Sequence, residues 1–378
     1  MHLYLHIPFC HQACHYCDFH FSTRMAGKSE LVQSLIKEIE LQKDYLGTRQ
    51  LSTVYFGGGT PSTLSLSELS SIFEVIHRHF DVESGAEITL EANPEDLTPT
   101  YIQGLKQIGV NRLSIGIQSF HDENLRFLNR NHDAEQSVQA IRDAQAIGIS
   151  NISIDIIYGI PGNDVGMLEH DLAKAVGTGV QHISAYSLTI EPKTVFGHRL
   201  KKGQLQESPE QNMADYFEYT HQFLENKGFT AYETSNFATP GNESRHNSSY
   251  WKQESYLGIG PAAHSFNQTS RQWNVANNAA YVKQITQGNI PAEVEILSPE
   301  NQINEYIMTQ LRTHWGVDLG YLRERFQSIQ AAFPEEEIVS WISNGYAVIS
   351  EDRLKLVGKG KLIADRLSAE IFILEDSK

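Results

Sequence analysis

The sequence predicts an α/β protein that is built on a parallel β-sheet and carries a smaller α+β unit near its C-terminal end. In the first 230 residues, six short runs of β-branched and aromatic residues alternate with six longer segments of helical periodicity. Glycine follows three of the helical segments, at Gly109, Gly148 and Gly228, where a left-handed residue readily ends a helix. Beyond residue 298 the pattern changes to several helices followed by two short strands.

The six strand–helix units follow one another in chain order. We expect strands over residues 3–6, 53–56, 87–91, 112–118, 152–158 and 182–188. We expect helices over residues 29–45, 67–79, 99–108, 134–147, 165–176 and 209–227. Pro99 after Thr98 is typical of the first turn of a helix. Such units pack as a parallel sheet with right-handed crossovers, and the periodicity leaves open a doubly wound sheet or a barrel.

The last 146 residues predict two further regions. Residues 233–297 are rich in Asn, Ser, Gly and aromatic residues, which indicates irregular structure or short strands around a site. Beyond them we expect helices over 300–313, 319–326, 334–344 and 358–372, and strands over 346–350 and 354–357. Helices with a two-stranded hairpin are typical of a small winged-helix-like domain. The predicted domains are therefore 1–232, 233–297 and 298–378.

The composition excludes several classes of protein. Of the 378 residues, 30 are Lys or Arg and 46 are Asp or Glu, so the formal net charge is −16. An acidic chain is a poor candidate for sequence-independent nucleic-acid binding, which needs basic surface. No apolar run reaches the roughly eighteen residues that a membrane span needs. The first residues lack the pattern of a signal peptide, and we expect a cytoplasmic protein.

All three cysteines lie within eight residues, at Cys10, Cys14 and Cys17. An odd, tightly spaced set in a chain of this kind argues against a disulfide framework. Thiolates favour iron–sulfur clusters and zinc, and three of them leave one iron of a four-iron cluster without a protein ligand. A zinc site with three cysteines and one histidine is the alternative, because four histidines crowd the same segment: His6, His11, His15 and His20.

The segment YLHIPFCHQACHYCDF resembles the CxxxCxxC signature of radical S-adenosylmethionine (SAM) proteins. Its HIPFC flank resembles the branch that contains oxygen-independent coproporphyrinogen III dehydrogenase and its heme-chaperone relatives. The resemblance implies a partial (βα)6 barrel, with the C-terminal domain packed against it. It also implies a 4Fe–4S cluster whose open iron is chelated by SAM, and a reductant whose electron the cluster can use to cleave SAM to a deoxyadenosyl radical.

Polar residues follow the predicted strands at their carboxyl ends, where parallel α/β folds place their sites. Three glycines precede Thr60 after the second strand, and their backbone N–H groups can approach a ligand closely. Glu91 ends the third strand and Gln118 the fourth. Asp155 lies in an otherwise apolar fifth strand, so it requires a partner such as Arg130 or a ribose hydroxyl.

The resemblance assigns roles to these residues. It implies contacts of Gly58, Gly59 and Thr60 with the methionyl part of SAM. It further implies SAM contacts from six side chains: Tyr4, Tyr16, Glu91, Gln118, Arg130 and Asp155.

A second motif, HNSSYW, begins at His246 in the segment after the last barrel unit. His and Tyr are both axial ligands of heme iron, and aromatic rings stack on porphyrins. The motif resembles the HNxxYW sequence that is associated with heme binding in the chaperone branch. We therefore expect His246 to ligate heme, with Tyr250 as the second candidate and His264 as a substitute.

Two departures separate this chain from the dehydrogenase of the same branch. The dehydrogenase carries a further cysteine just after the cluster motif and a longer N-terminal segment that helps to bind its substrate. In this chain the position of that cysteine is Phe19, and the cluster motif begins only ten residues into the sequence. The resemblance therefore favours a heme chaperone that passes heme to acceptor hemoproteins, membrane-associated respiratory proteins among them. Oxidative decarboxylation of coproporphyrinogen III is the first alternative, and a zinc-stabilised binding protein is the second.

Overall fold

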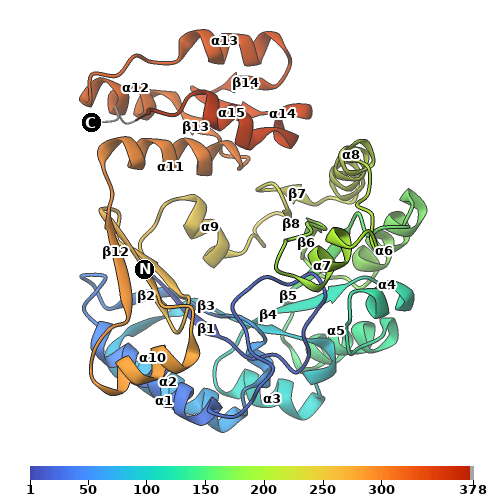
Figure 1. The fold of residues 1–378 in the computed structure, drawn as a ribbon, viewed down its shortest axis with the longest axis vertical. Coiled ribbons are helices and arrows are strands. Elements are labelled where there is room, and N and C mark those ends of the chain that lie inside the picture. Colours follow the sequence, from blue (N-terminus) through green and yellow to red (C-terminus); the bar gives the residue numbers. More distant parts are fainter. Residues whose placement is uncertain (375–378) are drawn as a thin grey trace.

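The computed structural model describes residues 1–374 and contains one large curved sheet with helices on its outer face (Figure 1). The sheet has twelve strands in the order β12-β11-β10-β9-β1-β2-β3-β4-β5-β6-β8-β7. Its central strands are β1 (His2–Ile7), β2 (Gln50–Gly58), β3 (Asp81–Ala92), β4 (Arg112–Gln118), β5 (Asn151–Tyr158) and β6 (His182–Ser187). All six predicted strands are confirmed.

The order of these six strands decides between a doubly wound sheet and a barrel, the two folds that the sequence left open. Strands β1 to β6 are parallel and adjacent in chain order. A doubly wound sheet requires the order to reverse at a switch point, whereas consecutive right-handed crossovers place every helix on one face. The fold is therefore a partial (βα)6 barrel, as expected. Its outer helices are α1 (Lys28–Gln42), α2 (Leu66–His79), α3 (Pro99–Gln107), α5 (Ala134–Ile147), α6 (Val165–Gly177) and α8 (Glu210–Asn226).

Helix ends follow local chemistry. The α2 helix begins after Ser65, whose side chain accepts from the Glu68 N–H while the Glu68 carboxylate accepts from the Ser65 N–H. The α5 helix ends at Gly148, whose φ is 92°. Within the barrel, two short helices were not expected: α4 (Asp122–Phe127) and α7 (Val195–Lys201). Each has seven residues or fewer, too short for a periodic pattern to be recognised.

The region after the barrel extends both ends of the large sheet. Strands β7 (Thr230–Ala231) and β8 (Asn236–Ala238) pair antiparallel beyond β6. On the other side β9 (Tyr256–Ile259) is parallel to β1, and β10 (His264–Phe266), β11 (Ser270–Asn274) and β12 (Ala292–Ile296) follow antiparallel. Two helices that were not expected lie between these strands, α9 (Arg245–Trp251) and α10 (Asn278–Thr286). The expected short strands are present, and they cover the β1 edge.

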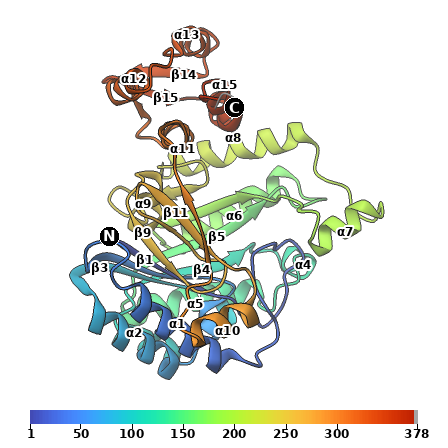
Figure 2. The ribbon, with the colours of Figure 1, turned by 60° about the vertical axis from the view of Figure 1, so that its left-hand side comes forward.

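The C-terminal unit has its own sheet and core, and it lies above the barrel (Figures 1 and 2). Its antiparallel sheet has the order β13-β15-β14, and its core includes Leu322, Trp341 and Leu354. The expected helix over 358–372 is divided in two at Ile363. The elements are α11 (Pro299–Leu311), β13 (Val317–Asp318), α12 (Leu319–Ser328), α13 (Glu335–Ser343), β14 (Ala347–Ser350), β15 (Arg353–Leu356), α14 (Lys359–Leu362) and α15 (Ala364–Glu370).

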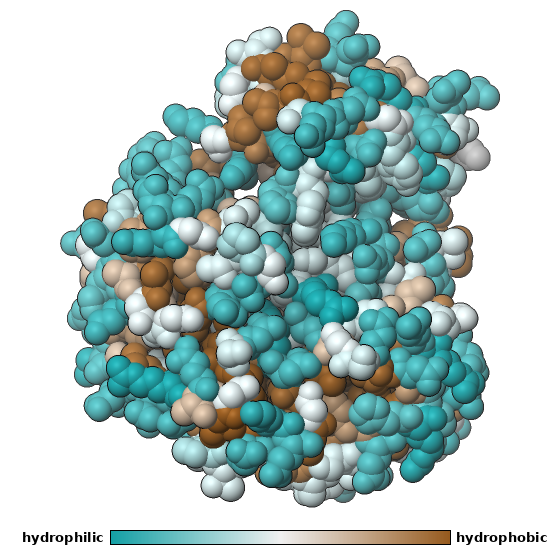
Figure 3. Space-filling model, turned by 180° about the vertical axis from the view of Figure 1, so that it is seen from behind, coloured by the Kyte–Doolittle hydropathy of each residue, from teal (hydrophilic) through white to brown (hydrophobic). Residues whose placement is uncertain are grey.

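Figure 3 shows apolar surface gathered on the C-terminal unit. In this unit α13 and β14 carry the exposed side chains Val339, Ile342, Val348 and Ile349. Within residues 1–374, the helices are all too short or too polar to cross a bilayer.

Candidate functional site

The three cysteines lie on a loop that follows β1 and is closed by backbone hydrogen bonds. The Cys10 N–H donates to the Ser22 carbonyl at 3.1 Å, and the Ser22 N–H donates to the Pro8 carbonyl at 2.9 Å. The His15 N–H donates to the Leu128 carbonyl at 3.1 Å, which ties the loop to the chain beyond α4. The loop is therefore held in place by its own backbone and by the neighbouring barrel unit.

A cavity of about 410 Å³ opens between this loop and the carboxyl ends of the strands. It brings together eleven of the fourteen predicted site residues: Cys10, Cys14, Tyr16, Cys17, Gly58, Gly59, Thr60, Glu91, Gln118, Arg130 and Asp155. The other three predicted residues, Tyr4, His246 and Tyr250, line a neighbouring chamber. Strand ends, not proximity in sequence, assemble the cavity.

Cys10 is buried, whereas Cys14 and Cys17 are partly exposed, and two of the three sulfurs accept hydrogen bonds from the barrel. Thr60 Oγ1 donates to Cys10 Sγ at 3.4 Å, and Arg130 Nη1 donates to Cys14 Sγ at 3.3 Å. Burial raises the pKa of Cys10 to about 11 and that of Cys17 to about 12. Thiolates at these positions therefore need a bound cation, because without one the thiols stay neutral.

The spacing of the sulfurs bears on which group they can hold. Tetrahedral zinc with Zn–S bonds of about 2.3 Å places its sulfurs about 3.8 Å apart. Within residues 1–374, only one group of three histidine, cysteine or acidic side chains has ligand atoms within 4.8 Å of one another, and it contains no cysteine. At least one pair of the three sulfurs is therefore more than 4.8 Å apart in this structure, so zinc binding by all three requires the loop to draw them closer.

The four histidines near the cysteines have other partners. His6 Nε2 lies 2.9 Å from the His20 carbonyl, and His15 Nδ1 lies 2.9 Å from the Phe127 carbonyl. His20 Nε2 lies 2.7 Å from Asn278 Oδ1. His11 Nε2 lies 3.6 Å from Asp96. A zinc site with three cysteines and one of these histidines requires the loop to rearrange.

Arg130 connects the cysteine loop to two barrel strands. Besides Cys14, its guanidinium donates through Nη2 to Asn93 Oδ1 at 2.6 Å and to the Gly116 carbonyl at 2.8 Å. Arg130 Nε has no hydrogen-bond partner among the described residues, although it is buried. Asn93 was not singled out in the sequence, and its only signal is its position two residues beyond Glu91 at the end of β3. The free N–H leaves one donor for a ligand.

Two half-buried carboxyl groups, Glu91 on β3 and Asp155 on β5, line the cavity. Glu91 accepts from the Tyr55 hydroxyl at 2.8 Å and from the Gly58 N–H at 3.2 Å. Burial raises the pKa of Glu91 to about 7 and that of Asp155 to about 6. The charges of Arg112 and Arg130 act on Asp155 in the opposite direction. The two carboxyls are suited to a cationic ligand, whose charge would ionise them.

The glycine loop at the end of β2, Gly58 to Thr60, does not offer its backbone N–H groups to a ligand as the sequence analysis expected. Its N–H groups do not point to a free ligand position: Gly58 donates to Glu91, Gly59 to the Ile7 carbonyl and Thr60 to the Phe9 carbonyl. Glycine is required here for packing, because a Cβ at Gly59 would lie 2.8 Å from the Phe9 carbonyl oxygen. At Gly58, φ is +109°. The glycines thus let the cysteine loop approach the sheet while still lining the cavity.

Gln118 and Tyr16 complete the cavity wall. Gln118 ends β4 with a φ of 72°, a left-handed conformation that is uncommon for a side chain of this size. Tyr16 packs against a small apolar group that contains Leu128, Ile157 and Phe196. A strained polar residue beside buried apolar contacts is typical of a ligand-binding position.

A second chamber of about 220 Å³ adjoins the cavity inside the barrel. Glu91, Ser114, Asp155 and Tyr186 line both spaces. Arg112 and Tyr55, which the sequence analysis did not single out, also line the chamber, and the Arg112 side chain is 2% exposed. Alternation along β2 and β4 could have placed them inside the barrel, but nothing local marks them as site residues.

The HNSSYW motif forms α9, whose first residues face this chamber. His246 is 2% exposed and stacks on Tyr55 with ring centroids 4.9 Å apart. Its Nδ1 lies 2.6 Å from Thr53 Oγ1, and its Nε2 lies 2.8 Å from the Tyr250 hydroxyl. Burial holds the pKa of His246 well below its usual range. Both ring nitrogens are therefore engaged, and this histidine is neutral.

His264 lies in a different environment. It is an exposed residue of β10, and its ring stacks on Trp273 with centroids 6.1 Å apart. Both rings line a surface cavity of about 680 Å³ bordered by β11, β12 and α10. Of the heme-ligand candidates, only His264 is exposed in this conformation.

Comparison with known proteins first defines the class. The family model of the Radical SAM superfamily matches residues 4–175, and that of the HemN C-terminal domain matches residues 297–363. The solved structure of coproporphyrinogen III oxidase (HemN) from Escherichia coli has the same fold, with a TM-score of 0.82 at 23% identity over 97% of this chain and 88% of that one. The barrel and its cysteine loop are those of radical SAM proteins, which use a 4Fe–4S cluster and SAM.

Sequence relatives define the family within this class. A heme chaperone HemW from Bacillus subtilis is 35% identical over 96% of this chain and 97% of its own length. HemW from Lactococcus lactis is 35% identical over 99% and 97%, and HemW from Haemophilus influenzae is 31% identical over 99% and 98%. The chain belongs to the HemW family.

The residues present fit the two cofactors of the superfamily. Three soft sulfur donors lie around one cavity, and a buried guanidinium donates to one of them. Two half-buried carboxyls line the remaining space, together with an arginine whose Nε–H has no partner among the described residues. This donor set suits a sulfur-ligated cluster together with a small molecule that carries both an ammonium and a carboxylate.

Proposed function

We propose that this protein binds heme and passes it to acceptor hemoproteins, with a cluster and SAM held in the 410 Å³ cavity. The observation that carries the proposal is the full-length similarity to HemW chaperones, in a chain whose Cys10, Cys14 and Cys17 surround one cavity. In this proposal the three thiolates ligate three irons of a 4Fe–4S cluster, and a reductant supplies its electron. The bound pair of cofactors supplies one-electron chemistry.

The cavity residues have separate roles in holding SAM. The ionised carboxylates of Glu91 and Asp155 receive the ammonium and the ribose hydroxyls. Arg130 offers its free Nε–H to an acceptor, and Gln118 binds from the rim. Gly58, Gly59 and Thr60 shape the methionyl side, and the Tyr16 ring closes the wall.

Tyr4 acts through its neighbours in this proposal. Its hydroxyl lies 3.1 Å from His6 Nδ1, and its ring is within 2.9 Å of the position that a Cβ at Gly57 would take. It therefore positions the glycine loop from the chamber side.

Heme ligation by His246 and Tyr250 requires α9 to move. His246 must leave Thr53, Tyr55 and a buried environment before its nitrogen can meet iron. His264 needs no such movement, because it already lines an open cavity beside Trp273. We propose His246 and Tyr250 as ligands of an opened α9, and His264 as the ligand of the conformation described here.

Heme titration of anaerobically reconstituted protein tests both ligands. His264→Ala should weaken binding at least tenfold if heme binds the described conformation, and His246→Ala should do so if α9 opens. His77→Ala, an exposed histidine of α2, is the matched control and should bind as the wild type does. Unchanged heme spectra in both variants would refute these ligands.

A second assay tests the proposed function against its enzymatic alternative. Coproporphyrinogen III, SAM and a reductant are incubated with cluster-loaded protein, and the porphyrin products are analysed by mass spectrometry. The proposal predicts no decarboxylated product. Its formation at many turnovers per chain would overturn the chaperone assignment.

A further inference from the structure

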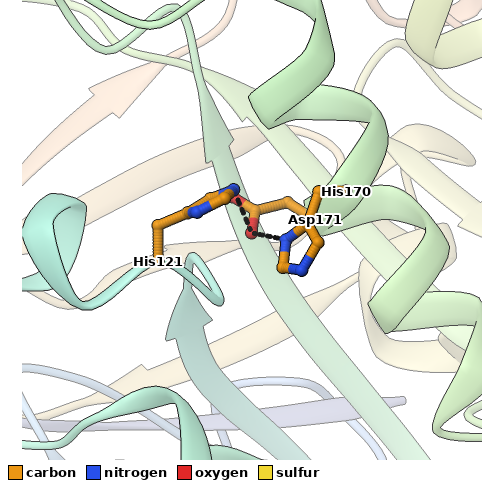
Figure 4. A group of neighbouring side chains, drawn as sticks. All are labelled: His121, His170 and Asp171. Carbon is orange, nitrogen blue, oxygen red and sulfur yellow. Dashed lines mark ion pairs between the residues drawn. The ribbon is translucent and has the colours of Figure 1, made fainter.

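A group of three potential ligands lies outside the cysteine cavity, between the loop after β4 and the α6 helix. His121 precedes α4, while His170 and Asp171 are consecutive residues of α6. Figure 4 shows both imidazoles directed toward the Asp171 carboxylate. Among the residues of the described chain, this is the only set of three such side chains whose ligand atoms all lie within 4.8 Å of one another.

The carboxylate is central to the group. His121 Nε2 and His170 Nδ1 each lie 3.8 Å from Asp171 Oδ1. The two imidazole centroids are 4.4 Å apart, at an angle of 44°. The side chains are 22%, 44% and 4% exposed for His121, His170 and Asp171, so solvent reaches the group from the histidine side.

Asp171 is held in position independently of the histidines. Its Oδ2 accepts from the Ser119 hydroxyl at 2.7 Å, and its Oδ1 accepts from the Phe120 N–H at 2.7 Å. Each oxygen keeps a further lone pair. An oriented, buried carboxylate of this kind resembles a ligand that is fixed by its outer hydrogen bonds.

Two imidazoles and one carboxylate are a donor set for divalent transition metals, zinc first among those commonly available. Bonds of about 2.1 Å in tetrahedral geometry place ligand atoms about 3.4 Å apart. The observed 3.8 Å separations are close to this value, and the exposed His170 can turn to shorten its own. His121 Nε2 also lies 3.2 Å from the Met167 carbonyl. Metal binding through Nε2 therefore breaks this hydrogen bond and requires the tautomer that carries its proton on Nδ1.

We propose that His121, His170 and Asp171 form a binding site for one divalent transition metal ion of the zinc type, with water in the remaining position. The site joins the loop after β4 to α6. This loop begins at Gln118, which lines the cysteine cavity, so metal binding would stabilise one wall of that cavity. The inference depends on neither SAM nor heme.

Calorimetric titration with ZnCl₂ tests the site in chelator-treated protein that retains its iron–sulfur cluster. Wild-type protein should bind one zinc ion per chain, and His121→Ala and His170→Ala should each weaken binding at least tenfold. His77→Ala should bind within twofold of the wild type. X-ray absorption at the zinc edge adds a direct readout of the ligands and should show nitrogen and oxygen neighbours only.

Zinc binding that is equal in wild-type and both histidine variants would overturn the proposal. Sulfur neighbours at the zinc edge would do the same, because they would place the metal at the cysteines. Iron and sulfide are measured in the same samples, so loss of the cluster is distinguished from loss of the zinc site.

Discussion

Arg130 is the residue at which the cysteine loop and the barrel strands meet. Its guanidinium donates to Cys14 Sγ, to Asn93 and to the Gly116 carbonyl. The guanidinium places a positive charge next to a sulfur that would be a thiolate in the cluster-bound protein. Removing this side chain would leave Cys14 Sγ, Asn93 Oδ1 and the Gly116 carbonyl without the donor that they share.

Arg130→Met tests this role. The variant should lose about 3 kcal/mol of unfolding free energy because it leaves buried acceptors without a donor. It should also retain less iron after anaerobic gel filtration, since Cys14 loses its cationic neighbour. Arg126→Met, an exposed arginine of α4, is the control for the loss of charge. Equal iron retention and equal unfolding midpoints in the two variants would contradict the assignment.

The half-buried carboxyls of the cavity predict a pH dependence of stability. Burial raises the pKa of Glu91 to about 7, from the value of 4.5 that is usual for this side chain. The folded state therefore binds more protons than the unfolded state between these values, and its stability falls as the pH rises through them. Without SAM, the unfolding free energy should decrease between about pH 5 and pH 8, by an amount on the order of 1 kcal/mol.

Glu91→Gln should reduce this slope, because the amide does not ionise. Denaturant unfolding of SAM-free protein at several pH values provides the measurement, and Asp155, with a pKa of about 6, accounts for part of the slope that remains. A variant with the slope of the wild type would show that Glu91 is not the titrating group.

At the scale of elements, α9 closes the barrel interior on the side of the second chamber. The Glu87 carboxylate on β3 accepts from the Arg245 N–H at 3.1 Å and from the His246 N–H at 3.0 Å. These are among the N–H groups that a helix leaves unpaired at its start, and a carboxylate is favoured there by the helix dipole. Glu87 thus fixes the helix that carries the HNSSYW motif.

Glu87→Gln should loosen α9 while it leaves β3, the strand that carries Glu87, unchanged. Amide hydrogen exchange over residues 244–251 should become at least tenfold faster, because the acceptor loses its charge. Glu74→Gln, on the exposed face of α2, is the control. If α9 opens to admit heme, Glu87→Gln should also speed heme association, and unchanged exchange would contradict the role of Glu87.

Local pattern predicted the barrel elements well, because each strand and long helix carries its own periodicity. The six strands and the cysteine loop follow from the sequence in this way. The pairing of β9 with β1 could not be predicted, since it joins residues more than 250 positions apart and depends on tertiary contact. The placement of the cavity residues followed from the rule that strand ends meet, whereas the burial of His246 depends on α9 docking into the barrel, which no local pattern shows.

At the scale of the whole molecule, the barrel and the C-terminal unit each have a hydrophobic core of their own. The barrel core contains Leu3, Phe56 and Ile154, and the C-terminal core contains Leu322 and Leu354. Because the cores share no residue, a defect in one is expected to spare the local packing of the other.

Leu354→Ala tests this separation. Leu354 is fully buried, so the cavity left by truncation should lower the stability of the C-terminal unit by about 2–5 kcal/mol. Hydrogen exchange should increase over residues 317–356, while SAM binding by the cluster-loaded barrel stays within twofold of the wild type. Val339→Ala, at an exposed position of α13, should change neither. A matching loss of SAM binding in Leu354→Ala would show that the two units are coupled.

The account depends most directly on an open iron that the three cysteines leave for SAM. Electron paramagnetic resonance of the reduced, anaerobically reconstituted protein tests this, together with iron and sulfide analysis. We predict about four irons and four sulfides per chain, and a cluster spectrum that changes when SAM is added. Stoichiometric zinc without sulfide, or a cluster spectrum that SAM leaves unaltered, would contradict it.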